Sequence, residues 1–214
     1  MSPYQGPVGT EAECEPGSHR RVLRNKLGLK RKSDADRAEY AALVQAQAHY
    51  YEVVITPSTR ITSSLLRRMH RDWLGSIYQW AGQYRSVELE KGGFVWPSSY
   101  IVPDNMARFE KEVLATHTPC KPAELGKVCL SVAVVHADFL YIHPFREGNG
   151  RLARWLADIM VTQAGCPLPA YHFAGPGSRR VREDYLAAVR SGYDQRYEAL
   201  ARFFETAILL RDTL

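Results

Sequence analysis

An apolar stretch at residues 125–142, which ends two residues before Pro144, constrains the fold of this 214-residue chain more than any other feature. On a helical repeat its apolar side chains occupy nearly every face, at Leu125, Val128, Cys129, Val132, Val135, Phe139 and Ile142. A helix that is apolar on nearly every face is buried on all sides, so we predict that this helix lies at the centre of the fold. Pro122 can occupy its first turn, and Pro144 cannot continue it.

Helical spacing of apolar residues continues through most of the chain. It predicts six further helices, at 33–51 (with a capping box at Ser33–Asp36), 61–80 (stopped by Gly82), about 104–113, 152–160, 181–190 and 197–210. Residues 84–96 alternate as a strand does and contain Gly92-Gly93, which predicts a β-hairpin. The expected fold is therefore all-α, a helical bundle with one small hairpin.

Positive charge is concentrated in an N-terminal arm. The net charge is +5, and residues 1–32 hold seven basic and three acidic side chains, which leaves +1 for residues 33–214. The first 18 residues, rich in Gly, Pro and Glu, are predicted to be flexible. Such an arm can bind nucleic acid or pack on the body through its apolar residues, which are Val22, Leu23, Leu27 and Leu29. We favour packing over nucleic acid, because no aromatic residues alternate with the charges to stack on bases.

Composition and the N-terminal sequence bear on the compartment. With 45% hydrophobic residues the chain can bury a sizeable core, which excludes global disorder. The N-terminus has no charged start followed by an apolar stretch, so we predict no secretory signal. From the sequence, we expect no apolar run that approaches the roughly 18 residues of a membrane span. We therefore expect a cytoplasmic protein that does not enter a membrane.

The residues that carry chemistry lie in one stretch, His143-Pro-Phe-Arg-Glu-Gly-Asn-Gly-Arg-Leu-Ala-Arg154. Its glycines, Gly148 and Gly150, allow successive backbone N–H groups to converge on an anion, and the next helix adds its positive N-terminal end. Arg151 and Arg154 are three residues apart and can each fork onto phosphate oxygens. These features together indicate a site for a polyphosphate.

The remaining polar residues of this stretch fit transfer chemistry at phosphorus. Glu147 supplies an oxygen ligand for Mg²⁺, Asn149 can hold a phosphate oxygen or cap the helix, and neutral His143 can accept a proton from an attacking hydroxyl. Taken separately, a histidine after a helix, a GNG turn and paired arginines each have ordinary structural explanations. Their coincidence within twelve residues favours nucleotidyl or phosphoryl transfer.

This stretch resembles, position for position, the HPFx(D/E)GNGRxxR signature of Fic-domain proteins. Residues 78–82, Tyr-Gln-Trp-Ala-Gly, together with Arg85 are similar to a Trp-Ala-Gly segment of that family, and VLRNKLG at 22–28 is similar to an N-terminal segment of some members. The likeness covers about residues 20–210. It implies a Fic-type helical bundle at 33–214, with a core at about 55–165, preceded by the arm at 1–32.

The resemblance also implies an activity, the movement of AMP from Mg·ATP to a Ser, Thr or Tyr hydroxyl of a target protein. It gives His143 the part of general base and Glu147 that of Mg²⁺ ligand. Gly148, Asn149 and Gly150 would line the anion hole, and the phosphates would be held by Arg151 and Arg154. Phe145 would pack into the core and fix the loop.

Two further assignments follow from the family. The hairpin at 84–96 falls where Fic proteins carry a flap that holds the target segment by strand pairing, with candidate docking residues Lys91, Gly92, Gly93 and Phe94. A purely structural hairpin is the alternative. Tyr185, in an Arg-x-x-Tyr segment, would lie near the adenine, although a tyrosine on a helix face is also typical of a core.

Regulation and the transferred group stay open. Many Fic proteins block their ATP site with a glutamate in an (S/T)xxxE(G/N) helix, and the only Glu before Gly or Asn here is Glu147 itself. We therefore expect a separate small antitoxin, or a target elsewhere, and a toxin-like protein. Alternative readings are a Fic enzyme that transfers UMP, phosphocholine or phosphate, and a catalytically silent, basic nucleic-acid-binding module. Gly150 argues against a Fic-like kinase, which has lysine there.

Overall fold

A computed structural model describes residues 11–210, and these residues divide into two compact units. Unit 1 comprises the described part of Met1–Val54 with Thr62–Ala107 and Ile142–Leu152. Unit 2 comprises Ile55–Ile61, Arg108–Tyr141 and the described part of Ala153–Leu214. Helix α6 (Asn149–Gln163) begins in unit 1 and continues in unit 2. Within the described residues the only paired strands form one short hairpin, so the all-α prediction is confirmed.

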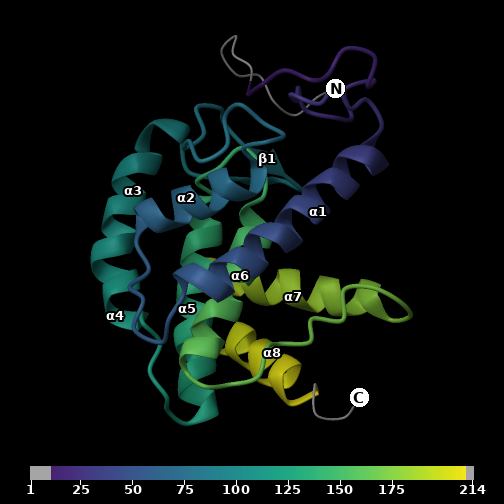
Figure 1. The fold of residues 1–214 in the computed structure, drawn as a ribbon. Coiled ribbons are helices and arrows are strands. Elements are labelled where there is room, and N and C mark those ends of the chain that lie inside the picture. Colours follow the sequence, from purple (N-terminus) through teal and green to yellow (C-terminus); the bar gives the residue numbers. More distant parts are fainter. Residues whose placement is uncertain (1–10, 211–214) are drawn as a thin grey trace. The chain divides into compact units, whose positions relative to one another are not determined.

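Unit 1 is built on two helices, α1 (Lys32–His49) and α2 (Ser63–Leu74), which pack against each other (Figure 1). A π-helical turn at Tyr50–Val54 extends α1. The buried face of α2 carries the apolar stripe expected from the sequence, Leu65, Leu66, Met69 and Trp73. Trp73 fixes the pair, because its Nε1 donates to the carbonyl of Glu39 at 2.8 Å.

Two helix boundaries in unit 1 differ from the prediction. The capping box at Ser33 is wrong: Arg31 is the N-cap, makes no side-chain cap bond, and instead donates its Nε to Asp34 at 2.7 Å. The helix predicted at 61–80 ends at Leu74, where the N–H of Gly75 bonds to the Arg71 carbonyl. The apolar positions beyond it, Ile77 and Trp80, are still buried but lie in turns, because burial alone does not require helical backbone.

The hairpin is shorter than the segment predicted for it. Strands β1 (Glu90–Lys91) and β2 (Phe94–Val95) pair antiparallel, with Glu90 opposite Val95. Gly92 and Gly93 form the two-residue turn with φ of 59° and 78°, as a type I′ turn requires. Only four residues of 84–96 are therefore in strands.

The arm is described from residue 11 onward, and its first ten residues lie outside the described part. Val22 is buried and the N–H of Lys26 bonds to the carbonyl of Ile77 at 2.8 Å, so this segment packs on the rest of unit 1. Of the apolar residues expected to make this contact, Leu27 is instead 52% exposed. The domain boundary at residue 33 stays a prediction.

Unit 2 contains most of α5 (Leu125–Ile142), the rest of α6, and two consecutive helices that pack on each other, α7 (Ser178–Tyr193) and α8 (Glu198–Leu209) (Figure 1). Helix α3 (Val102–Arg108) lies in unit 1 except for Arg108, and a π-helical segment of unit 2, Phe109–Leu114, connects it to α4 (Ala115–His117). Helix α5 begins at Leu125, so Pro122 precedes it and does not lie in its first turn.

Most of α5 is buried, but Leu130 and Tyr141 are 44% and 43% exposed, so the helix is not buried on all sides as predicted. Val132, Val135 and Phe139 have no exposed surface. In contrast to our sequence-based estimate, α5 is long and apolar enough to cross a membrane, with 18 residues at a mean hydropathy of 1.6. Because 56% of it is buried inside the protein, the helix also has the character of a core helix.

Candidate active site

The candidate site is centred on the loop that joins α5 to α6, and a buried arginine fixes the start of that loop. The guanidinium of Arg85 donates from Nε to the His143 carbonyl at 2.8 Å and from Nη2 to the Ile142 carbonyl at 3.4 Å. Its backbone N–H bonds to the Pro144 carbonyl at 2.8 Å. These bonds hold His143 at φ 51°, a left-handed conformation that costs free energy for a non-glycine residue.

The same arginine connects this loop to the hairpin stem. Arg85 Nη1 donates to the Val87 carbonyl at 2.9 Å, and Nη2 donates to the Pro97 carbonyl at 2.5 Å. Because its side chain has no exposed surface, these bonds do not compete with water. The backbone before β1, the backbone after β2 and the loop between α5 and α6 are therefore held by one side chain.

The middle of the loop is fixed by Phe145, as the sequence predicts. Phe145 is fully buried and its ring stacks on His70, with centroids 4.0 Å apart. The Asn149 side chain brackets this residue, because its Oδ1 accepts from the Phe145 N–H at 2.9 Å and its Nδ2 donates to the Phe145 carbonyl at 2.7 Å. The Asn149 side chain thus braces the loop that precedes α6, and its part in an anion hole stays a prediction.

His70 supports the loop from α2. Its Nδ1 accepts from the Gly82 N–H at 2.8 Å, so the ring proton lies on Nε2, which bonds to the Glu147 carbonyl at 3.0 Å. Burial is the main reason that the pKa of His70 falls to about 4. His70 is therefore a neutral residue of α2 that hydrogen-bonds to the loop at Glu147 and to the backbone at Gly82.

The loop ends in the N-terminus of α6. Gly148 has φ 86°, and a Cβ there would lie 3.0 Å from Cζ3 of Trp73, so the position requires glycine. Its carbonyl accepts from the N–H groups of Arg151 and Leu152. Gly150 lies in the first turn of α6, ahead of these two residues, and N–H groups at the start of a helix lack an intrahelical carbonyl partner and can bind an anion.

Charged side chains surround this helix end. Arg151 Nη2 forms an ion pair with Glu39 of α1 at 2.6 Å, and Glu147 Oε1 lies 3.6 Å from the same nitrogen. The guanidinium of Arg151 lies over the ring of Trp73 at 4.7 Å. Glu147 Oε1 also accepts from the Gly148 N–H at 2.9 Å, and its side chain is 50% exposed. Unit 1 therefore brings Glu147 and Arg151 together with Glu39 of α1 at the N-terminus of α6, and the catalytic and metal-binding parts of His143 and Glu147 stay predictions.

The hairpin reaches His143 through the residue that follows β2. The ring centroids of Trp96 and His143 lie 4.1 Å apart, and the backbone N–H of Trp96 donates to the Leu89 carbonyl at 3.1 Å. Phe94 packs edge-on against Trp96 at 5.3 Å. The predicted docking residues Lys91, Gly92 and Gly93 are exposed, and their contact with a target stays a prediction.

The second arginine of the motif lies in unit 2, one helical turn along α6. The guanidinium of Arg154 lies over the ring of Phe173 at 5.4 Å. Tyr185 is buried in the same cluster, with its hydroxyl 2.8 Å from Nε2 of His136. Burial lowers the pKa of His136 to about 3, with Arg154 as a lesser cause, so His136 is neutral. Tyr185 is thus part of the core that supports Arg154, and its contact with adenine stays a prediction.

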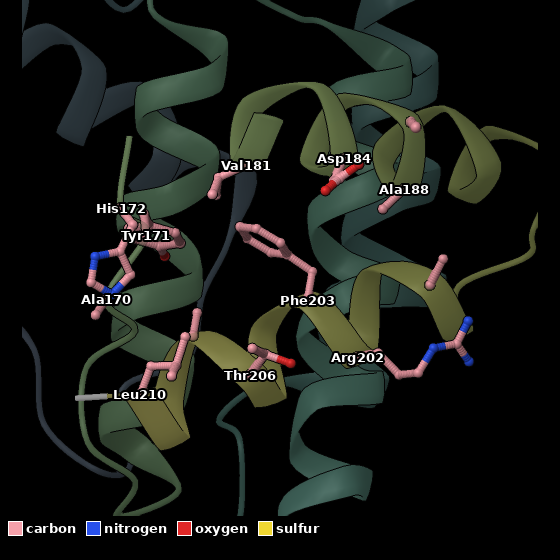
Figure 2. A pocket seen from close by; sticks show the side chains of 13 residues that line it. Ala170, Tyr171, His172, Val181, Asp184, Ala188, Arg202, Phe203, Thr206 and Leu210 are labelled. Carbon is pink, nitrogen blue, oxygen red and sulfur yellow. The ribbon is translucent and has the colours of Figure 1, made fainter. Parts of the chain in front are cut away.

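Unit 2 also contains a cavity of about 710 Å³ between α7, α8 and residues 170–172. Figure 2 shows Phe203 of α8 pointing toward α7, with Tyr171 and His172 at one side of the cavity and Arg202 at the other. Phe203 and Tyr171 both make ring contacts with Phe173, and the guanidinium of Arg154 lies over the Phe173 ring. The cavity wall is therefore continuous with the aromatic cluster around Arg154.

A half-buried acid, Asp158, contacts this cluster. Asp158 Oδ1 accepts from the Tyr171 hydroxyl at 2.6 Å. Burial raises the pKa of Asp158 to about 7, although the hydrogen bond and Arg154 favour its charged form.

Sequence reasoning missed the residues that support the loop from elsewhere in the chain. His70 and Glu39 lie in helices whose pattern identifies only a buried face, and nothing in the sequence pairs them with the motif. Arg85 stood beside a family-like segment, but its bonds to the loop follow only from the fold.

Comparison with known proteins identifies relatives of this chain. A sequence model of the Fic/DOC family matches residues 60–161, which include the hairpin and the loop. A protein adenylyltransferase Fic from Nematostella vectensis is 30% identical over 149 residues, which are 69% of this chain and 34% of the relative. A probable protein adenylyltransferase from Sinorhizobium fredii is 29% identical over 160 residues, covering 72% of this chain and 77% of that protein. The chain thus spans about a third of the Nematostella relative.

Solved structures show the same fold. The N-terminal Fic domain of an effector protein from Bartonella sp. AR 15-3 has a TM-score of 0.72 at 17% identity and covers 90% of this chain and 89% of its own. The BepC protein of Bartonella tribocorum, solved with bound AMPPNP, has a TM-score of 0.69 at 18% identity, with 86% and 91% covered. The family model spans the complete motif at 143–154, so residues 60–161 of this chain are a Fic/DOC domain.

Proposed function

We propose that this protein is a protein adenylyltransferase that transfers AMP from ATP to a hydroxyl side chain of a target protein. The observation that carries the proposal is the intact loop, in which His143 is held beside the hairpin while the N-terminus of α6 and Arg151 lie a few residues along. Relatives named protein adenylyltransferases, and a similar fold solved with AMPPNP, support ATP as the donor.

The reaction moves one proton and exchanges one bond at phosphorus. An imidazole nitrogen of His143 takes the proton of the target hydroxyl, and the oxygen forms a bond to the α-phosphorus of ATP. The bond from the α-phosphorus to the bridging oxygen breaks, and pyrophosphate leaves. The first N–H groups of α6 and the motif arginines Arg151 and Arg154 stabilise the phosphate charge throughout.

Glu147 is the residue that fits a magnesium ion. Its side chain is half exposed, and no group of three or more His, Cys, Asp or Glu side chains that could hold a metal occurs among residues 11–210. One carboxylate is what Mg²⁺ needs when phosphate oxygens and water complete its octahedron. Bound there, the ion would neutralise phosphate charge and so favour departure of pyrophosphate.

We propose that the hairpin receives the target. Its short strands and exposed turn leave backbone groups for pairing with an extended segment, which tolerates many side chains. The contact between Trp96 and His143 would bring a hydroxyl on that segment to the base.

We further propose that restraint comes from a separate small antitoxin and that the protein is toxin-like. Among the ion pairs of residues 11–210, the motif arginine that pairs with carboxylates is Arg151, with Glu39 and Glu147, and none of these pairs involves Arg154. The purified chain should then be active alone. Activity that appears only after one of its own helices is mutated would contradict this proposal.

Label transfer in a lysate tests the proposed reaction. Purified wild-type protein, His143→Ala and the control His49→Ala are incubated with lysate, Mg²⁺ and ATP labelled at either the α- or the γ-phosphate. We expect protein labelling from α-labelled ATP only, lost in His143→Ala and kept in His49→Ala. Labelling from the γ position would instead identify a kinase-like Fic enzyme, and labelling unaffected by His143→Ala would refute the assignment of the base.

A further inference from the structure

Helix α1 lies before the residues matched by the Fic/DOC model, yet it contributes a buried carboxylate to the motif. Glu39 is only 5% exposed, and its Oε2 lies 2.6 Å from Nη2 of Arg151. A carboxylate this deeply buried is costly unless it is paired. The pair therefore ties the first motif arginine to a helix outside the matched range.

Two further hydrogen bonds hold Glu39 in place. Its Oε1 accepts from the hydroxyl of Tyr78 at 2.5 Å, and its backbone carbonyl accepts from Trp73 Nε1 at 2.8 Å. The same Trp73 ring lies under the Arg151 guanidinium at 4.7 Å. Arg151 is thus clamped between a fixed carboxylate and a fixed aromatic face, both in unit 1.

A second carboxylate competes for this arginine. Glu147 Oε1 lies 3.6 Å from the same Nη2 that Glu39 engages, and the Glu147 side chain is half exposed and so able to move. Without Glu39, Arg151 would have Glu147 as its only anionic partner among the described residues. That pair would draw the guanidinium from an incoming phosphate and occupy the proposed ligand of the magnesium ion.

We propose that Glu39 is a positioning residue that holds Arg151 in a phosphate-binding orientation and keeps it from pairing with Glu147. The inference rests on the proposed function, because it assumes that Arg151 receives phosphate. Arginine has five N–H donors in a fixed fork, so engagement of one nitrogen by Glu39 leaves the others for an anion. An arginine oriented in advance loses little conformational entropy when the nucleotide binds.

Titration of ¹⁵N-labelled protein, followed by NMR, measures the effect. The ligands are Mg·AMPPNP and adenosine, which lacks phosphates, and the variants are Glu39→Gln and the control Asp36→Asn, an exposed acid of the same helix paired only with Lys32 in the ion pairs described. We expect Glu39→Gln to bind Mg·AMPPNP about tenfold more weakly, with the affinity for adenosine unchanged. Asp36→Asn should match the wild type for both ligands.

Three results for Glu39→Gln would overturn the inference. Equal affinity of wild type and Glu39→Gln for Mg·AMPPNP would remove the positioning role, and tighter binding would mean that Glu39 competes with phosphate. Equal loss for both ligands would identify a purely structural residue. If the wild type fails to bind Mg·AMPPNP, the proposed function fails instead, and the inference falls with it.

A milder substitution covers the case in which Glu39→Gln does not fold. Glu39→Asp keeps the charge but is one methylene shorter, so it cannot reach both Tyr78 and Arg151. The same comparison of Mg·AMPPNP with adenosine then applies. Selective loss of Mg·AMPPNP affinity supports positioning, and unchanged affinity contradicts it.

Discussion

The buried histidine His70 makes a specific prediction about acid stability. Its pKa falls from 6.5 to about 4 in the folded protein, so the unfolded chain takes up the proton first as the pH drops. The folded state therefore loses stability as the pH falls from 6.5 toward 4, and has no His70 contribution above that window. Two and a half pH units at 1.36 kcal/mol each give a loss of about 3 kcal/mol.

Other groups titrate in the same window, so a single stability curve would mislead. His136, with a pKa of about 3, acts in the same direction as His70. Asp158 acts in the opposite direction, because its pKa is raised to about 7 and the folded state takes up its proton first. Only the difference between wild type and a variant of His70 isolates the effect of this residue.

The informative variant is His70→Phe, which keeps an aromatic ring against Phe145 but removes the titrating group. At pH 7.5 it should be less stable than the wild type by about 1–3 kcal/mol, because the N–H of Gly82 loses its acceptor. By pH 4.5 this difference in stability should close or reverse, because only the wild type loses stability through protonation of His70 in the unfolded chain. Urea unfolding followed by circular dichroism from pH 4.5 to 7.5 measures it. Parallel curves for the two proteins would refute the neutral, buried His70.

Two further predictions concern the loop and its supports. Gly148→Ala should lower the free energy of unfolding by about 1–3 kcal/mol. In parallel urea titrations this loss should exceed that of Gly93→Ala, because both glycines have positive φ but only at Gly148 would the added Cβ lie 3.0 Å from Trp73. Arg85→Lys should lower the turnover of α-labelled ATP by about 100-fold and leave the affinity for Mg·AMPPNP unchanged. The reason is that a lysine cannot bond to the loop carbonyls and to the hairpin stem together, so His143 loses its orientation. Equal losses for the two glycines, or a loss of affinity in Arg85→Lys, would contradict these explanations.

The parts of the fold that the sequence predicted are those determined by local pattern. The apolar faces of 125–142 identified α5 as a buried helix, and Gly92-Gly93 located the hairpin turn, since each signal lies within one element. The end of α2 was missed because Ile77 and Trp80 are buried in turns and so continue the apolar spacing beyond the helix. The π-helical turn at Tyr50–Val54 has no pattern of its own.

In the candidate site, too, the sequence predicted the residues of the local motif but not those that packing brings to it. The motif supplied His143, Glu147 and Arg151 because all three lie within nine residues of sequence. Its supports could not be predicted, since Glu39 and His70 reach the loop only after α1 and α2 have packed. Tertiary contacts between distant segments decide how the motif arginine and the loop are held, and a single sequence does not contain them.

The central claim is that His143 activates a hydroxyl for attack on the α-phosphorus. The most direct test isolates the labelled target and determines by tandem mass spectrometry which group it carries and on which side chain, with wild type and His143→Ala in parallel. The account predicts AMP on Ser, Thr or Tyr with wild type and none with His143→Ala. Phosphate or another group on the target, AMP on a side chain without a hydroxyl, or unchanged modification by His143→Ala would contradict it.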